Sequence, residues 1–193
     1  MKFKRVCVFC GSNIGRGEKY RAAAVKMGHA LAARGLELVY GGGKVGLMGA
    51  IADAVLERGG RVIGVIPRDL VKKELAHRGL TELRIVGSMH ERKALMARLS
   101  DGFIALPGGF GTLDEFCEIL TWAQLGLHSK PSGILDVGGY FGHFLKFVDH
   151  SVAQGFVRRE HRDQLLVARA PDELLDAFAR HKPVHLDKWL KKP

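Results

Sequence analysis

The feature of this sequence that most constrains its fold is a regular alternation of short apolar runs with longer amphipathic stretches. The runs are nearly continuous and rich in β-branched residues, which is typical of strands buried on both faces of a parallel sheet. The stretches between them repeat apolar residues at helical spacing. The sequence predicts strands at residues 6–9, 36–40, 62–66, 83–86, 103–106, 132–135 and 165–167.

The amphipathic stretches predict helices at residues 19–34, 47–58, 89–100, 112–125, 141–154 and 172–180, and residues 67–81 are expected to form a long polar loop. Alternating strands and helices favour an α/β fold with right-handed crossovers. We therefore expect a single Rossmann-like domain, a doubly wound parallel sheet of about seven strands with helices on both faces. It is expected to span residues 1–193, with a basic tail from about residue 181.

The composition excludes several classes of protein. A hydrophobic content of 47% is too high for a disordered chain. The sequence has no apolar run of about 18 residues for a membrane span, and its first residues do not match a secretory signal. Three cysteines cannot form a disulfide framework, so we expect a cytoplasmic protein. Cys7 and Cys10 lie on opposite faces of a strand and are not expected to bind a metal.

Glycine is abundant, and its distribution is uneven. Many of the 25 glycines fall into three clusters, at residues 11–17, 41–49 and 108–111, and each cluster follows a predicted strand. In open parallel sheets, ligands bind beyond the carboxyl ends of the strands. The three clusters are therefore expected to converge on one crevice, with Gly11, Ser12, Gly42 and Gly43 among its lining residues.

The second cluster matches the pattern G-x-G-x-x-G at Gly41–Gly46, between a predicted strand and a predicted helix. A helix N-terminus offers free N–H groups and a positive dipole end, which suit a phosphate. The pattern is also compatible with a plain tight turn. Lys44 is followed by Val45 instead of Ser or Thr, so the segment is not the phosphate loop of nucleotide triphosphatases.

The third cluster lies in the more specific segment Pro107–Glu115. Thr112 and Glu115 have the spacing of a capping box at a helix start. A capping box does not account for the proline and three glycines that precede it. The segment therefore favours a cradle of backbone N–H groups for a phosphate, with the Glu115 carboxylate one turn into the helix.

The segment Met89–Lys93 opens another predicted helix with Arg92 and Lys93 in its first turn. Cations are electrostatically unfavourable near a helix N-terminus. Such a run is often only a solvated charged turn, but a local rule broken at the end of a strand also indicates a site. Arg92 would offer a planar fork to a phosphate or carboxylate.

Taken together, the glycine cluster at 41–49, the segments 89–93 and 107–115, and residues 121–126 resemble the LONELY GUY (LOG) family of cytokinin riboside 5′-monophosphate phosphoribohydrolases. The resemblance covers roughly residues 5 to 180. It implies a Rossmann-like fold and a homodimer with the site near the subunit interface, without metal or cofactor. The implied reaction is hydrolysis of the N-glycosidic bond in N6-modified adenosine monophosphates, and in AMP itself, to the free base and ribose 5-phosphate.

The resemblance also implies roles for individual residues. It assigns catalysis to Arg92 and Glu115. Members of the family often carry the label lysine decarboxylase, but no pyridoxal phosphate site is signalled in this sequence. The implied substrate contacts are Glu74, Lys93, Gly109, Phe110, Gly111, Thr112, Leu113, Asp114 and Thr121.

Three other functions fit parts of the sequence. A non-catalytic carrier, for example of molybdenum cofactor, would use the same glycine loops for binding alone. A dinucleotide-dependent oxidoreductase would need an acid after the next strand, where Asp69 is available. The net charge of +10 suggests a nucleic-acid partner, but part of it lies in residues 180–193, with five Lys or Arg and one Asp. No basic stripe with interleaved aromatics is present, so we expect the charge to steer a phosphorylated small molecule and expect no nucleic-acid partner.

Overall fold

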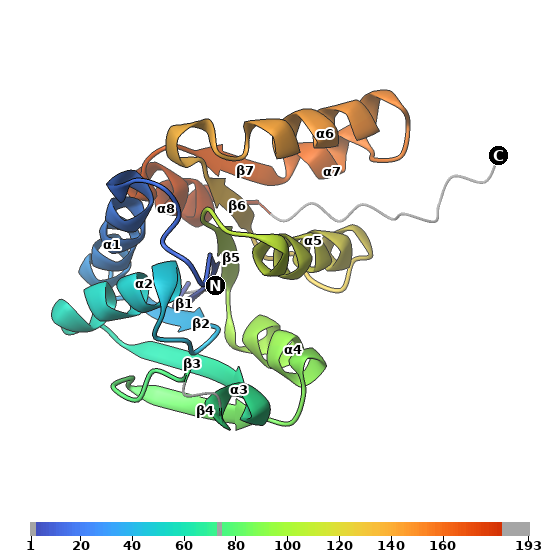
Figure 1. The fold of residues 1–193 in the computed structure, drawn as a ribbon. Helices are drawn as coiled ribbons and strands as arrows, with labels where there is room; N and C mark the ends of the chain where they lie inside the picture. The colour runs from blue at the N-terminus through green and yellow to red at the C-terminus, as the bar shows by residue number, and fades with distance from the viewer. Residues whose placement is uncertain (1–2, 73–74, 183–193) are drawn as a thin grey trace.

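Seven parallel strands form one sheet in the order β4-β3-β2-β1-β5-β6-β7 (Figure 1). The structure is a computed structural model that describes residues 3–72 and 75–182. The chain moves outward from β1 to β4 on one side, then returns to place β5 beside β1. This reversal is the topological switch point where ligands bind in such sheets. The strands are β1 (Arg5–Phe9), β2 (Glu37–Tyr40), β3 (Val62–Pro67), β4 (Glu82–Val86), β5 (Gly102–Ala105), β6 (Ser132–Leu135) and β7 (Leu165–Ala168).

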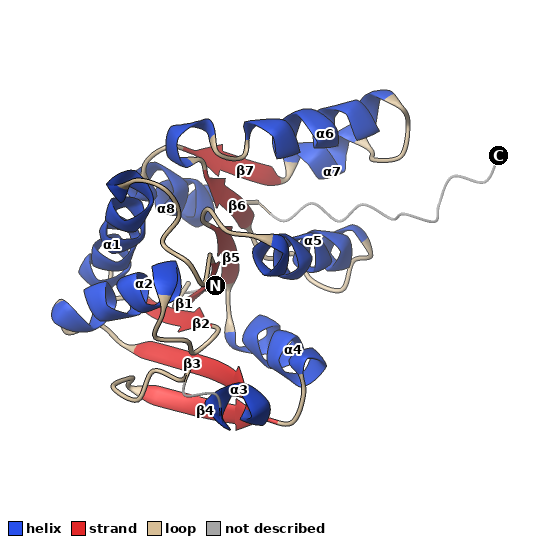
Figure 2. Ribbon diagram, in the orientation of Figure 1, coloured by secondary structure: helices blue, strands red, loops and turns tan. Residues whose placement is uncertain are grey.

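Helices cover both faces of the sheet, so the predicted α/β fold is confirmed (Figure 2). One face carries α1 (Glu18–Ala33), α2 (Gly46–Glu57) and α8 (Pro171–Arg180). The other carries α4 (Met89–Leu99), α5 (Phe110–Gln124) and α6 (Gly142–Ala153).

Each layer of helices packs on its own hydrophobic cluster, and alternate residues of one strand enter different clusters. Val6 and Val8 of β1 pack under α1, α2 and α8, whereas Cys7 and Phe9 pack under α4, α5 and α6. This two-sided burial explains why the strands read as continuous apolar runs. Cys10 belongs to the first cluster, so Cys7 and Cys10 lie on opposite faces of the sheet, as predicted.

The predicted loop at residues 67–81 is partly wrong. Pro67 ends β3, and a short helix, α3 (Arg68–Lys72), follows at once. Another short helix, α7 (Arg159–Asp163), and a 3₁₀ turn, η1 (Val137–Gly139), were not predicted either. These elements are too short to display a helical apolar period, which is the signal that reveals longer helices.

Helix α5 begins at Phe110 instead of Thr112, and its N-cap is Gly109. Thr112 is therefore inside the helix, and the capping box considered for Thr112 and Glu115 does not exist. Most of the basic tail, from residue 183, lies outside the described residues. Within the described ranges, no helix has the length and apolar character needed to cross a bilayer.

Candidate active site

A cleft of about 550 Å³ opens at the switch point between β1 and β5, a size typical of small-molecule sites. The loops after these strands are joined where the Gly11 N–H donates to the Pro107 carbonyl at 3.0 Å. The Leu47 N–H at the start of α2 donates to the Gly11 carbonyl, also at 3.0 Å. Members of all three glycine clusters line the cleft, so they converge as the sequence predicts.

A buried ion pair lies in the wall of this cleft. Arg92 of α4 and Glu115 of α5 approach to 3.3 Å between Nη2 and Oε1, and their side chains are only 10% and 11% exposed. The two residues are 23 positions apart in the sequence and come from different helices on the same face of the sheet. The structure thus brings together the two residues to which the family resemblance assigns catalysis.

Burial raises the pKa of Glu115 above its ordinary value of 4.5, and the nearby carboxylates of Asp114 and Glu118 act in the same direction. The positive charges of Arg92 and Lys93 oppose this rise in the pKa. A carboxylate with a raised pKa holds a proton more strongly, so Glu115 is a better proton acceptor than an exposed glutamate.

The N-terminus of α5 opens into the same cleft. Gly109 provides no side-chain cap, and the first helical bond runs from the Leu113 N–H to the Gly109 carbonyl at 3.2 Å. The N–H groups of Phe110, Gly111 and Thr112 precede that bond and are typical anion-binding groups at a helix start. A Cβ atom at Gly109 or Gly111 would meet no atom within 4 Å, and neither residue has a positive φ. The fold itself does not require glycine at these two positions.

In the other glycine loop, which follows β2, the fold itself requires glycine at several positions. Gly42 and Gly46 have φ angles of 74° and 64°, which favour glycine. A Cβ at Gly46 would overlap the backbone of Ser12, and one at Gly49 would overlap the backbone of Lys44. Gly46 allows the chain after β2 to pass close to the loop after β1, and Gly49 allows α2 to pack against Lys44.

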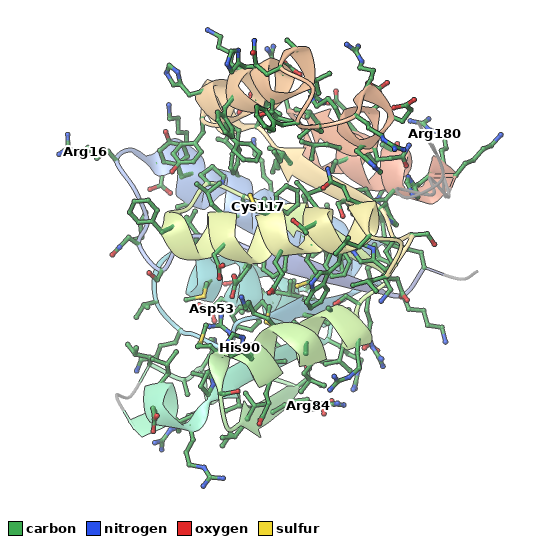
Figure 3. All side chains as sticks on the ribbon, turned by 90° about the vertical axis from the view of Figure 1, so that its right-hand side faces the viewer. Arg16, Asp53, Arg84, His90, Cys117 and Arg180 are labelled. Atoms are coloured by element: carbon green, nitrogen blue, oxygen red, sulfur yellow. The ribbon has the colours of Figure 1, made fainter. Side chains whose placement is uncertain are left out.

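The first turn of α4 is stabilised in spite of its two cations. The Ser88 hydroxyl accepts a hydrogen bond from the Glu91 N–H at 3.1 Å, and the Glu91 carboxylate accepts one from the Gly87 N–H at 2.7 Å. Lys93 Nζ lies 3.2 Å from carboxylate oxygens of both Asp114 and Glu118 on α5. Figure 3 shows α4 and α5 side by side, with His90 at the start of α4 and Cys117 within α5.

Comparison with known proteins shows the family of this chain. A family model described as "Possible lysine decarboxylase" matches residues 48–178. A relative from Oryza sativa subsp. japonica, "Probable cytokinin riboside 5′-monophosphate phosphoribohydrolase LOGL9", is 53% identical over 95% of this chain and 81% of its own length. The Arabidopsis thaliana "Cytokinin riboside 5′-monophosphate phosphoribohydrolase LOG3" is 48% identical over 95% of this chain and 86% of its own length. The chain belongs to the LONELY GUY family.

The solved structures that resemble this chain share its fold. A molybdenum cofactor binding protein from Rippkaea orientalis superposes with a TM-score of 0.70 and 19% identity, covering 93% of this chain and 98% of that one. At such identity the similarity supports the architecture and no particular activity. The LONELY GUY relatives, at about half identity, are the similarity that bears on function.

Most of the predicted site residues lie in the cleft, and four described ones do not. Gly42 faces Ile66 and Leu83 of the neighbouring strands, and Leu113 packs toward the core. Lys93 faces the carboxylates of α5, and Thr121 donates to the Cys117 carbonyl at 2.8 Å within its own helix. Glu74 lies outside the described residues. For these residues, contact with substrate stays a prediction. Those that line the cleft are Gly11, Ser12, Gly43, Arg92, Gly109, Phe110, Gly111, Thr112, Asp114 and Glu115.

Sequence reasoning missed Tyr140, which lines the cleft from the loop after β6. Its hydroxyl donates to the Gly108 carbonyl at 2.5 Å, and its ring packs edge-on against Tyr20 at 5.7 Å between centroids. The signal was present: Gly138 and Gly139 form a fourth glycine group after a strand, and both have positive φ. Tyr140 thus ties the loop after β6 to the glycine loop of the cradle.

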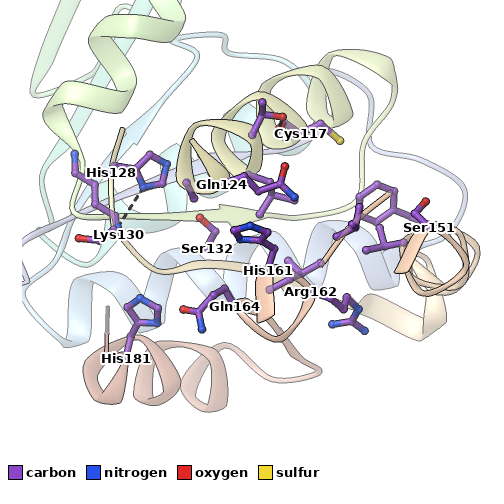
Figure 4. A pocket seen from close by; sticks show the side chains of 18 of the residues that line it. Cys117, Gln124, His128, Lys130, Ser132, Ser151, His161, Arg162, Gln164 and His181 are labelled. Atoms are coloured by element: carbon purple, nitrogen blue, oxygen red, sulfur yellow. Dashed lines mark hydrogen bonds between the residues drawn. The ribbon is translucent and has the colours of Figure 1, made fainter. Parts of the chain in front are cut away.

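A second pocket of about 240 Å³ lies apart from the cleft, between α5, α6 and the start of β6 (Figure 4). Cys117 and Thr121 face this pocket. Burial raises the pKa of the Cys117 thiol, which favours the neutral form and argues against a nucleophile. Within the described ranges, no three His, Cys, Asp or Glu side chains are grouped to hold a metal ion.

Proposed function

We propose that this protein hydrolyses the N-glycosidic bond of purine nucleoside 5′-monophosphates. The substrates are N6-modified adenosine monophosphates and AMP, and the products are the free base and ribose 5-phosphate. The observation that carries the proposal is the buried Arg92–Glu115 pair in the same cleft as the uncapped N-terminus of α5. The names and identities of the LONELY GUY relatives support the same reaction.

The 5′-phosphate would bind at the start of α5. The N–H groups of Phe110, Gly111 and Thr112 and the helix dipole favour an anion there. The absence of side chains at Gly109 and Gly111 leaves room for phosphate oxygens to approach the backbone. Binding energy from this remote group can position the reacting C1′ atom.

The carboxylate of Glu115 would act at the sugar. Breaking the C1′–N9 bond leaves the electron pair on the purine and positive charge on the ribose, as in glycoside hydrolysis. A water oxygen then bonds to C1′, and its proton can pass to Glu115 and from there to the purine nitrogen. The raised pKa of Glu115 suits it to accept that proton, and the negative charge of its ionised form would stabilise the cationic sugar.

A guanidinium does not readily give up a proton, so we do not assign Arg92 the role of general acid. Its fixed positive charge would instead stabilise negative charge on the departing purine or on the phosphate. The charge of Arg92 also favours the ionised form of Glu115, because it lowers the Glu115 pKa against the larger effect of burial.

The remaining walls of the cleft suit a purine. Met48, Ile66, Leu70, Leu75 and Met89 contribute apolar surface to it. Flat aromatic bases and apolar N6 substituents gain affinity from such surfaces. This distribution supports adenine nucleotides that carry an apolar N6 group as well as AMP.

The test is chromatography of reaction mixtures that contain purified protein with AMP or with N6-isopentenyl AMP. We expect release of adenine and of N6-isopentenyladenine. Absence of base release from both would contradict the proposal. Nucleotide binding without base release, measured by calorimetry, would favour a carrier on the same fold.

Substitution of the carboxylate locates the chemistry. Glu115→Gln is expected to bind AMP but to lose at least about 100-fold in kcat, because an amide cannot accept the proton. Asp53→Asn is a matched control, since Asp53 contacts His77 at 2.8 Å and does not line the cleft. Full activity of Glu115→Gln would remove Glu115 from catalysis.

We also propose a homodimer with the site near the interface, in a cytoplasmic setting. Phe110 lies at the cleft and exposes 93% of its surface, and a second copy could cover it. The three cysteines are free thiols, which suits a reducing compartment. Light scattering should give about twice the chain mass of 21.2 kDa, and Phe110→Asp should shift the protein toward the monomer.

A further inference from the structure

Gly41 lies at the carboxyl end of β2, against the guanidinium of Arg92. It does not have a positive φ, so its backbone conformation does not require glycine. A Cβ atom at this position would overlap Arg92 Nη2 and lie 3.0 Å from Arg92 Cζ and 3.4 Å from Met48 Sδ. We propose that Gly41 is a positioning residue, whose missing side chain leaves the space in which Arg92 lies beside Glu115.

The reason that this space matters is that hydrogen bonds hold Arg92 only weakly. Its Nη1 donates to the sulfur of Met89 at 3.6 Å, and sulfur is a weak acceptor. Its Nε is buried and has no hydrogen-bond partner within the described part of the chain. Its Nη2 meets a single carboxylate oxygen of Glu115 at 3.3 Å. The position of the guanidinium is therefore set largely by the shape of its surroundings, and Gly41 forms one wall.

A methyl group at Gly41 would push the guanidinium away from this position. The inference rests on the proposed hydrolase reaction for its kinetic readout. Gly41→Ala is expected to lower kcat by about 100-fold, because small displacements of catalytic groups have effects of this size. The KM for AMP should change by less than kcat, since the N–H groups proposed to bind the phosphate, at the N-terminus of α5, are untouched.

Displacement of the Arg92 guanidinium should also shift the pH dependence of activity in a definite direction. Because the charge of Arg92 lowers the pKa of Glu115, moving that charge away raises the pKa. The acidic limb of the kcat/KM profile should therefore shift to higher pH in Gly41→Ala. If Gly41→Ala only reduced the fraction of folded protein, kcat/KM would fall equally at every pH and the acidic limb would not move.

A double-mutant cycle tests whether Gly41→Ala lowers kcat through Arg92 or independently of it. In an Arg92→Ala background the guanidinium is absent, so adding Gly41→Ala should change kcat by less than about twofold. Gly142→Ala is the control for the chemical change, because a Cβ there meets nothing within 4 Å and Gly142 does not line the cleft. It should retain wild-type kcat. Losses that multiply in the double variant would overturn the inference.

The distance between Arg92 and Glu115 tests the positioning role of Gly41 independently of the proposed reaction. Crystal structures of the wild type and of Gly41→Ala should show the Nη2–Oε1 distance between Arg92 and Glu115 lengthening from 3.3 Å. An unchanged distance would overturn the positioning role, whatever the activity. Lack of base release by the wild type would overturn the proposed function while leaving this structural result meaningful.

Discussion

The two glycine loops of the cleft look alike in sequence but differ in what surrounds their glycines. In the first, which runs from the end of β2 into the first turn of α2, Cβ atoms at Gly41, Gly46 and Gly49 would overlap other atoms of the protein. In the second, which runs from the end of β5 into the first turn of α5, Cβ atoms at Gly109 and Gly111 would project into open space. Gly108 is the exception, since its Cβ would overlap Thr112.

This difference teaches that similar glycine patterns can serve different purposes. The first loop needs glycine so that backbone segments and the Arg92 side chain can approach it closely. The second keeps two glycines that the fold does not require, next to uncapped N–H groups of α5. A residue type that structure leaves unexplained at a cleft is an indication of a ligand. The loops should therefore respond differently to the same substitution.

The largest effect is expected in the first loop. Gly46→Ala would place a methyl group against the backbone of Ser12 at a φ of 64°. Overpacking and left-handed strain together should reduce the free energy of unfolding by about 4 kcal/mol. Urea denaturation measures this loss, with Gly142→Ala as the control. A loss below about 1 kcal/mol would show that the loop can move aside and that its glycines are dispensable for the fold.

The second loop should show the opposite response. Gly111 lies in the first turn of α5, where alanine is the better helix former, so Gly111→Ala should leave stability unchanged or raise it by about 0.5 kcal/mol. The KM for AMP should rise about tenfold, because the methyl group interferes with one charge-assisted hydrogen bond to phosphate. Denaturation and steady-state kinetics on the same preparation check both parts. A destabilised protein with an unchanged KM would erase the distinction between the loops.

The sequence could predict the sheet and the convergence of the loops because both follow from local patterns. Continuous apolar runs located every strand, and strand ends located the glycine clusters. The contact between Arg92 and Glu115 depends on the packing of α4 beside α5, which no local pattern contains. The same is true of Tyr140, whose hydroxyl reaches Gly108 from 32 positions away. The direction of Lys93 also could not be predicted, because a helical residue can turn toward a cleft or toward a neighbouring helix.

Arg92 lies against Gly41 of the first loop and pairs with Glu115 of α5, the helix that follows the second loop. The pH dependence of activity therefore tests whether the two loops serve one site. Burial raises the Glu115 pKa above 4.5, so the acidic limb of kcat/KM should lie above pH 4.5. Between the unfolded and the higher folded pKa, the folded state binds more protons, so the contribution of Glu115 to stability falls as pH rises through that window. Urea denaturation of wild type and Glu115→Gln across this range should show the wild type losing stability relative to the variant. An acidic limb at or below pH 4.5 would contradict the assignment.

The smallest expected effect concerns the ion pairs between α4 and α5, the helix that follows the second loop. Lys93 joins α4 to α5 through Asp114 and Glu118, and its side chain is 13% exposed. Desolvation lowers the Lys93 pKa, but its hydrogen bonds to the two carboxylates outweigh this and raise the pKa overall. Lys93→Met keeps the approximate length of the side chain but removes its charge. It should reduce the free energy of unfolding by only about 1 kcal/mol, because the carboxylate partners are partly exposed.

Kinetics of the same variant decide what Lys93 does besides joining the helices. If its ammonium group acts only between α4 and α5, the KM for AMP should rise by less than about threefold. Arg84→Met is a matched control, since Arg84 pairs with Glu82 on the surface at 2.6 Å and lies outside the cleft. A tenfold rise in KM with unchanged stability would instead support the substrate contact that the family resemblance implies. That result would mean that Lys93 leaves its carboxylate partners when nucleotide binds, and that the charge beside the second loop is mobile.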